Sequence, residues 1–198
     1  MGAGNYTVRV IFAGNENYNE NENVSTFKVT TTGTNFVIIT NGSEITYGGA
    51  INITQRLPAE ATGNVVYRFA NGTMIKVIGV NEAFVLSGLD AGSYVVYANY
   101  SGDSNYASAL DSVTIVINKA INNVVISASD VTYPDNVTLN VKADIDGVYI
   151  IYVGGSEVKV NVVDGKGNFS ISLGVGKYST LTHIYVPNYE NNVSGAIV

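Results

Sequence analysis

One tyrosine-centred pattern recurs three times along the chain at an almost constant spacing. Each copy has a glycine two residues before a tyrosine, then a run with apolar residues at alternate positions, and then an Asn-Tyr pair. The leading tyrosines are Tyr6, Tyr94 and Tyr178, so the copies are 88 and 84 residues apart. Similarity at a fixed period is typical of an array of like modules. The chain should therefore fold as consecutive copies of one unit.

The segments between these copies also correspond to one another. Residues 36–39 match residues 124–127, and residues 45–47 match residues 131–133. Each is a short run of alternating apolar residues, and Gly, Asn or Asp turns separate the runs, which favours a sandwich or barrel. No apolar stripe of helical period is present, so helix content should be close to nil. The expected fold class is all-β, with tandem immunoglobulin-like antiparallel β-sandwiches.

The segment that opens the second and third copies, Leu-x-x-Gly-x-Tyr, predicts a tyrosine corner. In β-sandwiches a tyrosine near the start of the penultimate strand folds back, and its hydroxyl bonds to the backbone a few residues upstream. The glycine permits a backbone conformation that a Cβ disfavours, and the leucine would fill the core beneath. The alternative, a strand that merely begins with tyrosine, is disfavoured by the recurrence in register. The predicted corner residues are Leu89, Gly92, Tyr94, Leu173, Gly176 and Tyr178.

Placing this corner in the penultimate strand divides the chain. Residues 1–33 are expected to be the C-terminal hairpin of a truncated preceding repeat. Residues 34–119 and residues 120–198 are each expected to form one Ig-like repeat, the second with a short or truncated final strand. An isolated two-stranded hairpin is marginal in water, so the apolar face of the first segment would need a partner.

The repeats resemble a known kind of surface domain. With their abundant Asn, their Gly-x-Tyr corner and the turn Gly102-Asp103-Ser104-Asn105-Tyr106, they resemble the Ig-like repeats of large adhesin-like surface proteins of methanogenic archaea. They are also similar to bacterial Ig-like domains of comparable length. The resemblance covers essentially the whole chain and implies an extracellular stalk or adhesion module. It does not specify a binding partner.

Charge and composition exclude several classes of function. Ten Lys and Arg residues against 16 Asp and Glu give a net charge of −6, whereas binding to nucleic acid or an anionic membrane needs a basic patch. No disulfide can form, because the chain has no cysteine. No stretch is long and apolar enough for a membrane span. The N-terminus lacks the pattern of a signal peptide, so an export signal and an anchor are expected outside this sequence.

Nine Asn-x-Ser/Thr sequons suggest a secreted, glycosylated surface. The alternative is that the bias toward Asn and Thr in turns and strand faces inflates their number. Asn52 is the weakest acceptor, because it lies inside an expected strand. The other eight are the candidate glycosylation sites: Asn5, Asn23, Asn41, Asn71, Asn99, Asn136, Asn168 and Asn192.

No catalytic, cofactor-binding or metal site is predicted. The only histidine, His183, is expected to point away from the core. Without a cysteine or a second histidine, neither a Cys/His pair nor a zinc site can form. Residues 15–22 are rich in the oxygen ligands that Ca²⁺ takes, but the corresponding turn at residues 186–189 offers almost none, so a solvated turn is expected.

The sequence therefore predicts a non-catalytic extracellular structural or adhesion module, the stalk of a repetitive cell-surface protein. Its expected partners are neighbouring repeats of the same chain and an unidentified extracellular protein or glycan. Two alternatives stay open, a carbohydrate-binding module and an accessory domain of a secreted hydrolase. A carbohydrate-binding module needs an exposed aromatic platform, for which the candidates are Tyr97, Tyr149 and Tyr152.

Overall fold

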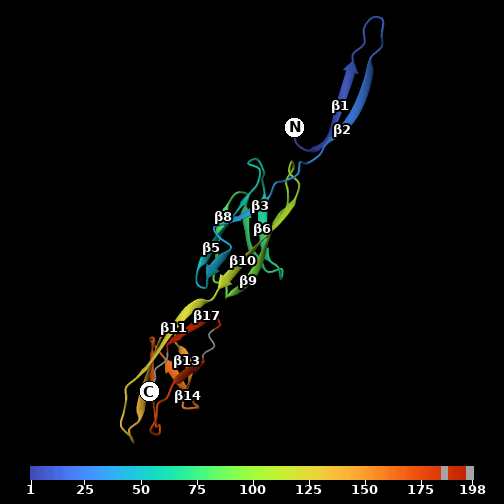
Figure 1. Ribbon diagram of the computed structural model, residues 1–198. Coiled ribbons are helices and arrows are strands. Elements are labelled where there is room, and N and C mark those ends of the chain that lie inside the picture. The colour runs from blue at the N-terminus through green and yellow to red at the C-terminus, as the bar shows by residue number, and fades with distance from the viewer. Residues whose placement is uncertain (184–186, 195–198) are drawn as a thin grey trace. The chain divides into compact units, whose positions relative to one another are not determined.

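The computed structural model describes residues 1–183 and 187–194, with the side chains of all of them except Leu181 and His183 (Figure 1). The regular structure in this part of the chain is entirely β, in 17 strands, which confirms the expected all-β, Ig-like fold class. No helix in the described residues is long and apolar enough to cross a membrane. Two compact units form, one from Met1–Ile45, Gly49–Ser87 and Ser93–Val116, the other from Thr46–Gly48, Gly88–Gly92 and Ile117–Val198.

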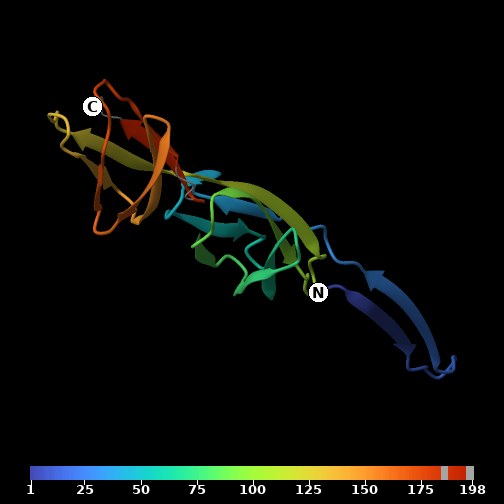
Figure 2. The same ribbon diagram turned by 90° about the horizontal axis from the view of Figure 1, so that it is seen from below.

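Strands β1 (Gly4–Phe12) and β2 (Asn21–Val29) form an antiparallel two-stranded sheet of their own within the first unit (Figures 1 and 2). The two strands are paired along their whole length. The rings of Tyr6 and Phe27 stack across the hairpin, with their centroids 5.4 Å apart. Most other apolar side chains of this hairpin are exposed, so its sheet has no opposite layer in the described structure.

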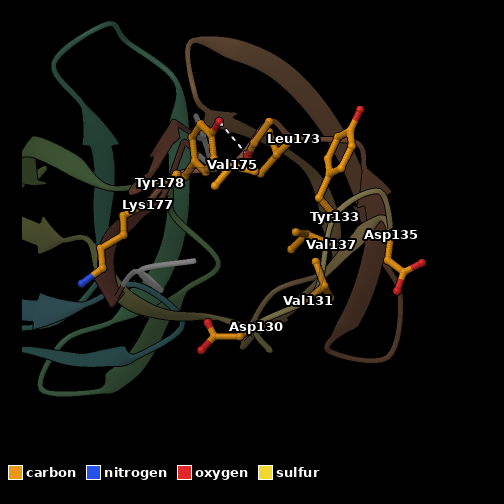
Figure 3. Close-up of a pocket in the computed structure, with 11 residues that line it drawn as sticks. Asp130, Val131, Tyr133, Asp135, Val137, Leu173, Val175, Lys177 and Tyr178 are labelled. Carbon is orange, nitrogen blue, oxygen red and sulfur yellow. Dashed lines mark hydrogen bonds between the residues drawn. The ribbon is translucent and has the colours of Figure 1, made fainter.

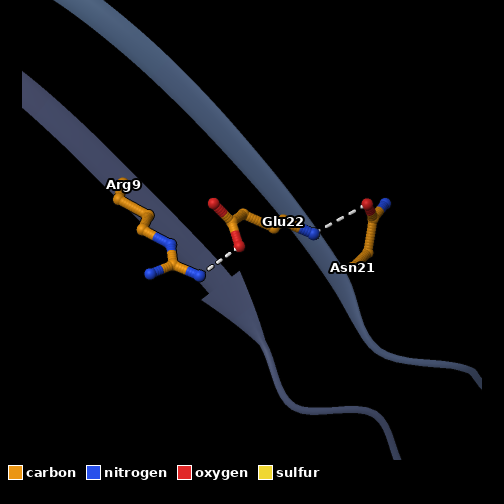
Figure 4. Close-up of polar contacts among 3 residues, drawn as sticks. All are labelled: Arg9, Asn21 and Glu22. Atoms are coloured by element: carbon orange, nitrogen blue, oxygen red, sulfur yellow. Dashed lines mark hydrogen bonds and ion pairs between the residues drawn. The ribbon is translucent and has the colours of Figure 1, made fainter.

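An ion pair between Arg9 and Glu22 crosses the same hairpin, and the Glu22 N–H donates to the side-chain oxygen of Asn21 (Figure 4). Both charged side chains are exposed to solvent, by 60% for Arg9 and 40% for Glu22. An exposed pair of this kind contributes only about 0–1 kcal/mol. The hairpin is therefore held mainly by its backbone pairing and by the stacked rings.

Residues 37–118 form two sheets with the strand order of an Ig-like sandwich. The orders are β3-β5-β8 and β4-β10-β9-β6-β7. In immunoglobulin nomenclature β3, β5 and β8 correspond to strands A, B and E, and β6, β9 and β10 to strands C, F and G. The bounds are β3 (Val37–Thr40), β4 (Glu44–Thr46), β5 (Ala50–Arg56), β6 (Asn64–Phe69), β7 (Met74–Gly79), β8 (Ala83–Ser87), β9 (Gly92–Tyr100) and β10 (Ala109–Asn118).

The core of this sandwich comes from every second residue of its strands, because successive side chains of a strand point to opposite faces. In β9, for example, Val96, Ala98 and Tyr100 are fully buried, and Tyr97 and Asn99 between them are exposed. The same alternation in β5, β6 and β10 buries Ile51, Ile53, Val65, Tyr67, Ile115 and Ile117.

Residues 120–194 form the second sandwich. Its described sheets have the orders β15-β12-β11-β17 and β14-β13-β16. Their bounds are β11 (Ala120–Ala128), β12 (Val137–Ala143), β13 (Gly147–Val153), β14 (Ser156–Val162), β15 (Lys166–Ile171), β16 (Thr180–His183) and β17 (Tyr189–Ser194). A short or truncated final strand is expected for this repeat, and residues 195–198 lie outside the described part of the chain.

The pairing of β11 with β17 departs from the expected antiparallel pattern. β11 and β17, the first and last strands of this sandwich, pair in parallel from Ala120–Tyr189 to Val125–Ser194, and lie side by side in Figure 1. They run in the same direction because the strands alternate in direction along the chain and an odd number of described strands, β12 to β16, separates them. The core is otherwise like the first, with Val124, Leu139 and Ile151 fully buried.

Candidate functional site

The tyrosines that open the first and third copies of the repeated pattern bond back to the chain. Tyr6 Oη donates to the Gly2 carbonyl at 2.6 Å, and Tyr178 Oη donates to the Gly174 carbonyl at 3.1 Å. In both cases the acceptor lies four residues upstream. Tyr94 is half-buried, and its ring centroid lies 5.6 Å from that of Phe69. We call residues 1–6, 89–94 and 173–178 the corner segments.

The leucines and glycines of the corner segments differ in their surroundings. Leu173 and Tyr178 pack against the core of the second unit, and Leu89 is half-buried. Gly92 has a φ of 157°, a conformation that a Cβ disfavours. Gly176 does not have a positive φ, so the expectation of such a conformation there is wrong. The hydroxyl bond of Tyr178 forms without it.

A further Gly-x-Tyr segment, residues 147–149, forms the same bond. Gly147 has a φ of 156°, and Tyr149 Oη donates to the Ile145 carbonyl at 2.6 Å. Tyr149 Oη also accepts a hydrogen bond from Nδ2 of the fully buried Asn122, at 3.1 Å. Sequence reasoning missed this segment because it opens β13 and falls outside the period of the repeat, although the Gly-x-Tyr spacing itself was visible.

This burial overturns the aromatic strip on which carbohydrate binding would depend. Tyr149 is 0% exposed, because it is one of the residues of β13 whose side chains point into the core. Tyr97 is 40% exposed, but it lies on β9 of the first unit. Tyr152 is half-buried and donates its hydroxyl to Glu157 Oε2 at 3.0 Å. The three tyrosines therefore form no common exposed platform.

The turn that follows each corner strand is built in the same way in both places where it is described. Gly14 and Gly102 have φ values of 79° and 81°. A Cβ at Gly102 would lie 2.8 Å from the Tyr106 carbonyl oxygen and the Ser108 nitrogen, so only glycine fits. Asn15 Oδ1 and Asp103 Oδ1 each accept hydrogen bonds from the second and third backbone N–H groups after them, at 2.8–3.0 Å.

Asp103 also ties this turn to the loop before β6. Its Oδ2 accepts hydrogen bonds from the N–H and hydroxyl of Thr62, at 2.7 and 3.0 Å. The N–H groups of Asn105 and Thr62 hold the pKa of the Asp103 carboxyl well below its usual range. Tyr100 Oη donates to the Thr62 carbonyl at 2.9 Å. The carboxylate is thus a structural acceptor.

In the Asn-Tyr turns of the second and third copies, Asn105-Tyr106 and Asn188-Tyr189, the asparagine accepts a hydrogen bond from a corner segment. Within the first unit, the Ala3 N–H donates to Asn105 Oδ1 at 3.1 Å. Within the second unit, which includes residues 88–92, the Ala91 N–H donates to Asn188 Oδ1 at 2.7 Å. Both donors lie three residues before the corner tyrosine.

Two further interactions accompany the hydrogen bond between Ala91 and Asn188. Asn188 Nδ2 donates to Asp90 Oδ1 at 2.9 Å. The rings of Tyr47 and Tyr189, both in the second unit, meet edge to face with centroids 5.5 Å apart. This turn is therefore bound through its amide group and through its aromatic ring.

A pocket of about 480 Å³ lies at the end of the second unit where the third corner segment is found (Figure 3). The loop between β11 and β12 contributes Tyr133, and the loop between β15 and β16 contributes Tyr178, on another side of the opening. Val175 is 92% exposed and Tyr133 is 68% exposed. The other lining residues are Asp130, Val131, Asp135, Val137, Leu173, Gly174, Gly176 and Lys177.

The eight candidate glycosylation sites are all exposed in the structure, as is Asn52. Some of their side chains have hydrogen-bond partners. Asn41 Oδ1 accepts from the Asn52 N–H at 2.8 Å, and Asn71 Oδ1 accepts from the Thr73 N–H at 3.0 Å. Asn5, Asn23, Asn99, Asn136 and Asn168 complete the exposed set together with Asn192.

The described residues contain no group of three or more His, Cys, Asp or Glu residues that could hold a metal ion. The expected orientation of His183 falls on a side chain outside the described part of the structure. The acidic loop at residues 15–22 carries the turn described above, in which Asn15 bonds to the backbone.

Tyr67 carries a buried polar group at the centre of the first unit. Its hydroxyl donates to Gln55 Oε1 at 2.6 Å, and Gln55 Nε2 donates to the Gly79 carbonyl at 2.8 Å. Both side chains are at most 3% exposed. Burial raises the pKa of Tyr67 to about 12, because a phenolate loses its hydration there.

This pKa predicts an alkaline loss of stability in the first unit. The unfolded chain releases the Tyr67 proton near pH 10 and the folded chain near pH 12, so the folded state is favoured below pH 10 and loses that advantage as the pH rises through 12. Between pH 9 and pH 11 the titration of Tyr67 should lower the free energy of unfolding by roughly 1 kcal/mol. Urea unfolding followed by circular dichroism at several pH values measures it. Tyr67→Phe should reduce the decline, and the exposed control Tyr18→Phe should not.

Comparisons with known proteins identify solved structures of low similarity to this chain. No family model matches the chain, and no curated protein sequence matches it. Among solved structures, the fibronectin(III)-like modules of Clostridium thermocellum CbhA share 11% identity over 81% of this chain and 91% of theirs, with a TM-score of 0.36. Murine CEACAM1b shares 10% identity over 81% and 96%, with a TM-score of 0.34. The Ig-like assignment rests on the strand order of each sandwich.

Proposed function

We propose that this chain is a non-catalytic, extracellular structural and adhesion module, part of the stalk of a repetitive cell-surface protein. In this proposal residues 1–33 are the last hairpin of a preceding repeat, and residues 34–119 and 120–198 are two further repeats. In this proposal the parent protein is one of the large adhesin-like surface proteins of methanogenic archaea. Exposed sequons support a glycosylated exterior.

The parallel pairing of β11 with β17 is the observation that carries the proposal. These strands begin and end the second sandwich, and six residue pairs join them. In a parallel pair the start of the first strand and the end of the last lie at opposite ends of the ladder. A force applied along the chain therefore loads the hydrogen bonds of this ladder together, in shear. Such an arrangement suits a module that transmits tension.

The recurring corner contacts support a serial role as well. The same N–H to asparagine bond joins a corner segment to the next Asn-Tyr turn at Ala3–Asn105 and at Ala91–Asn188. A single residue, Lys119, separates the end of β10 from the start of β11. A connection this short favours a stiff spacer over a flexible linker.

Single-molecule pulling with two attachment geometries tests the proposal. The chain contains no cysteine, so Lys119→Cys with Ser194→Cys supplies unique handles that shear the β11–β17 ladder. The matched control, Lys119→Cys with Pro187→Cys, pulls on the two strands from the same end and opens the ladder pair by pair. We expect a several-fold higher rupture force for the first geometry. Equal forces would show that the ladder is not a mechanical element.

A further inference from the structure

We propose that the pocket of the second unit binds the Asn-Tyr turn of another module of this kind, one that follows in the same polypeptide. In detail, the N–H of Val175 would donate to the asparagine side chain, and the ring of Tyr133 would pack against the tyrosine. This inference rests on the proposed function, because it takes the chain to be a stretch of an array.

The tyrosine corner explains why this N–H is available. Tyr178 Oη holds the carbonyl of Gly174, and that carbonyl belongs to the same peptide group as the N–H of Val175. In a trans peptide the C=O and N–H point in opposite directions. Because Tyr178 Oη holds the Gly174 carbonyl on one side of the peptide group, the Val175 N–H points in the opposite direction, away from the tyrosine. A ligand on that side can accept a hydrogen bond from it.

The first corner segment shows this peptide group with its ligand in place. Tyr6 Oη holds the Gly2 carbonyl, and the N–H of the same peptide, from Ala3, donates to Asn105 Oδ1. A Cβ on Gly2 would lie 2.7 Å from Asn105 Oδ1. Gly174 stands at the corresponding position of the third segment, so the same close approach is open there.

The second corner segment shows the aromatic half of the contact. Tyr47 meets the ring of Tyr189 and is half-buried. Tyr133 corresponds to Tyr47 in the aligned loops, yet it is 68% exposed. Ala3 and Ala91, whose N–H groups are bound, are likewise half-buried, whereas Val175 is almost fully exposed. The third segment thus repeats the donor and the ring of the first two, and both remain open to solvent.

The apolar walls of the pocket fit a tyrosine. Val131, Val137 and Leu173 line it beside Tyr133, while the side chain of Lys177 points away from these walls in Figure 3. A phenol ring places its apolar body against such walls and keeps its hydroxyl near solvent. The volume of about 480 Å³ is at the scale of a small-ligand pocket.

A following module is favoured over a second copy of this chain by two observations. The bound asparagines lie 102 and 97 residues after their donors in the same chain, so the partner of Val175 should lie about one repeat further on. In a second copy, moreover, Asn105 and Asn188 already accept hydrogen bonds from Ala3 and Ala91, which leaves the Asn17-Tyr18 turn of the hairpin for such a contact.

The test extends the chain by one module. A second copy of residues 116–198, joined directly after Val198, continues the repeat in register and presents a further Asn188-Tyr189 turn 96 residues after Val175, one residue short of the 97-residue spacing of the second pair. Hydrogen exchange of peptides covering residues 173–178 reports on the Val175 amide. We expect exchange there to slow by about tenfold or more in the extended chain. Asn188→Ala in the appended copy should abolish the protection, and Asn192→Ala there should leave it.

Three results would overturn the proposal. These are unchanged exchange at residues 173–178 on extension, protection that survives Asn188→Ala in the appended copy, and protection of the unextended chain that rises with its concentration, which would identify a second copy as the ligand. If the appended module does not fold, an extension made of residues 116–119 followed by residues 34–119 presents Asn105-Tyr106 instead. The pulling experiment does not involve the pocket, so the proposed function can survive a negative result here.

Discussion

Tyr100→Ala should destabilise the first unit by about 3–5 kcal/mol, the range for removing a buried aromatic side chain. Tyr100 is 0% exposed, its ring lies 6.5 Å from that of Phe36, and its hydroxyl donates to the Thr62 carbonyl. Truncation would leave a cavity and an unpaired carbonyl. Urea unfolding followed by circular dichroism measures the loss, and the transition of the second unit should not move.

The N-terminal hairpin supplies a matched control for this variant. Phe12 stands on β1 where Tyr100 stands on β9, six residues after the corner tyrosine, but it is 46% exposed. Phe12→Ala should therefore cost less than about 1 kcal/mol. A cost like that of Tyr100→Ala would mean that the apolar face of the hairpin is covered in solution, and would contradict the exposed face described here.

Breaking the Asn122–Tyr149 hydrogen bond should have the second largest effect. Asn122 and Tyr149 are both 0% exposed and join β11 to β13 through Nδ2 and Oη. Tyr149→Phe removes the donor to the Ile145 carbonyl and the acceptor for Asn122. Leaving buried groups unpaired costs about 1–3 kcal/mol, and Asn122→Ala should cost a similar amount in the second unit.

A double-mutant cycle separates this interaction from general packing. The combined variant Asn122→Ala with Tyr149→Phe should cost less than the sum of the two single variants, by about 0.5–3 kcal/mol, because the bond is lost only once. The pair Asn122→Ala with Tyr178→Phe is the control, since Tyr178 bonds to Gly174 instead, and its costs should add. Additive costs for Asn122 and Tyr149 would show that their hydrogen bond contributes nothing to stability.

The N-terminal hairpin shows that an apolar pattern shared with another repeat predicts a strand face but not its burial. Its apolar face matches residue by residue the buried face of β9 and β10: Tyr6, Val8, Val10, Phe12, Phe27 and Val29 correspond to Tyr94, Val96, Ala98, Tyr100, Ile115 and Ile117. In β9 and β10 this face is core, apart from half-buried Tyr94, whereas in the hairpin most of it is exposed. Burial depends on a facing sheet as well as on the pattern.

Hydrogen bonds between a side chain and the nearby backbone, by contrast, depend on the residue types of a short segment. The Gly-x-Tyr segments and the Gly-Asx turns each depend on a side chain that bonds to backbone within four residues, at Tyr6, Tyr178, Asn15 and Asp103. Contacts over so short a stretch are set by the order of residues and need little from the rest of the fold. Gly176 was the exception, since its backbone does not take the expected conformation.

The sequence by itself determined the all-β, Ig-like repeat, because alternation, turn residues and a fixed period are local properties repeated along the chain. Only the tertiary structure decided which tyrosines are buried, that β11 and β17 pair in parallel, and that the amides of Ala3 and Ala91 bind asparagines about a hundred residues away. Each of these depends on residues far apart in the sequence, whose meeting is fixed by the packing of whole strands and leaves no mark in any short segment.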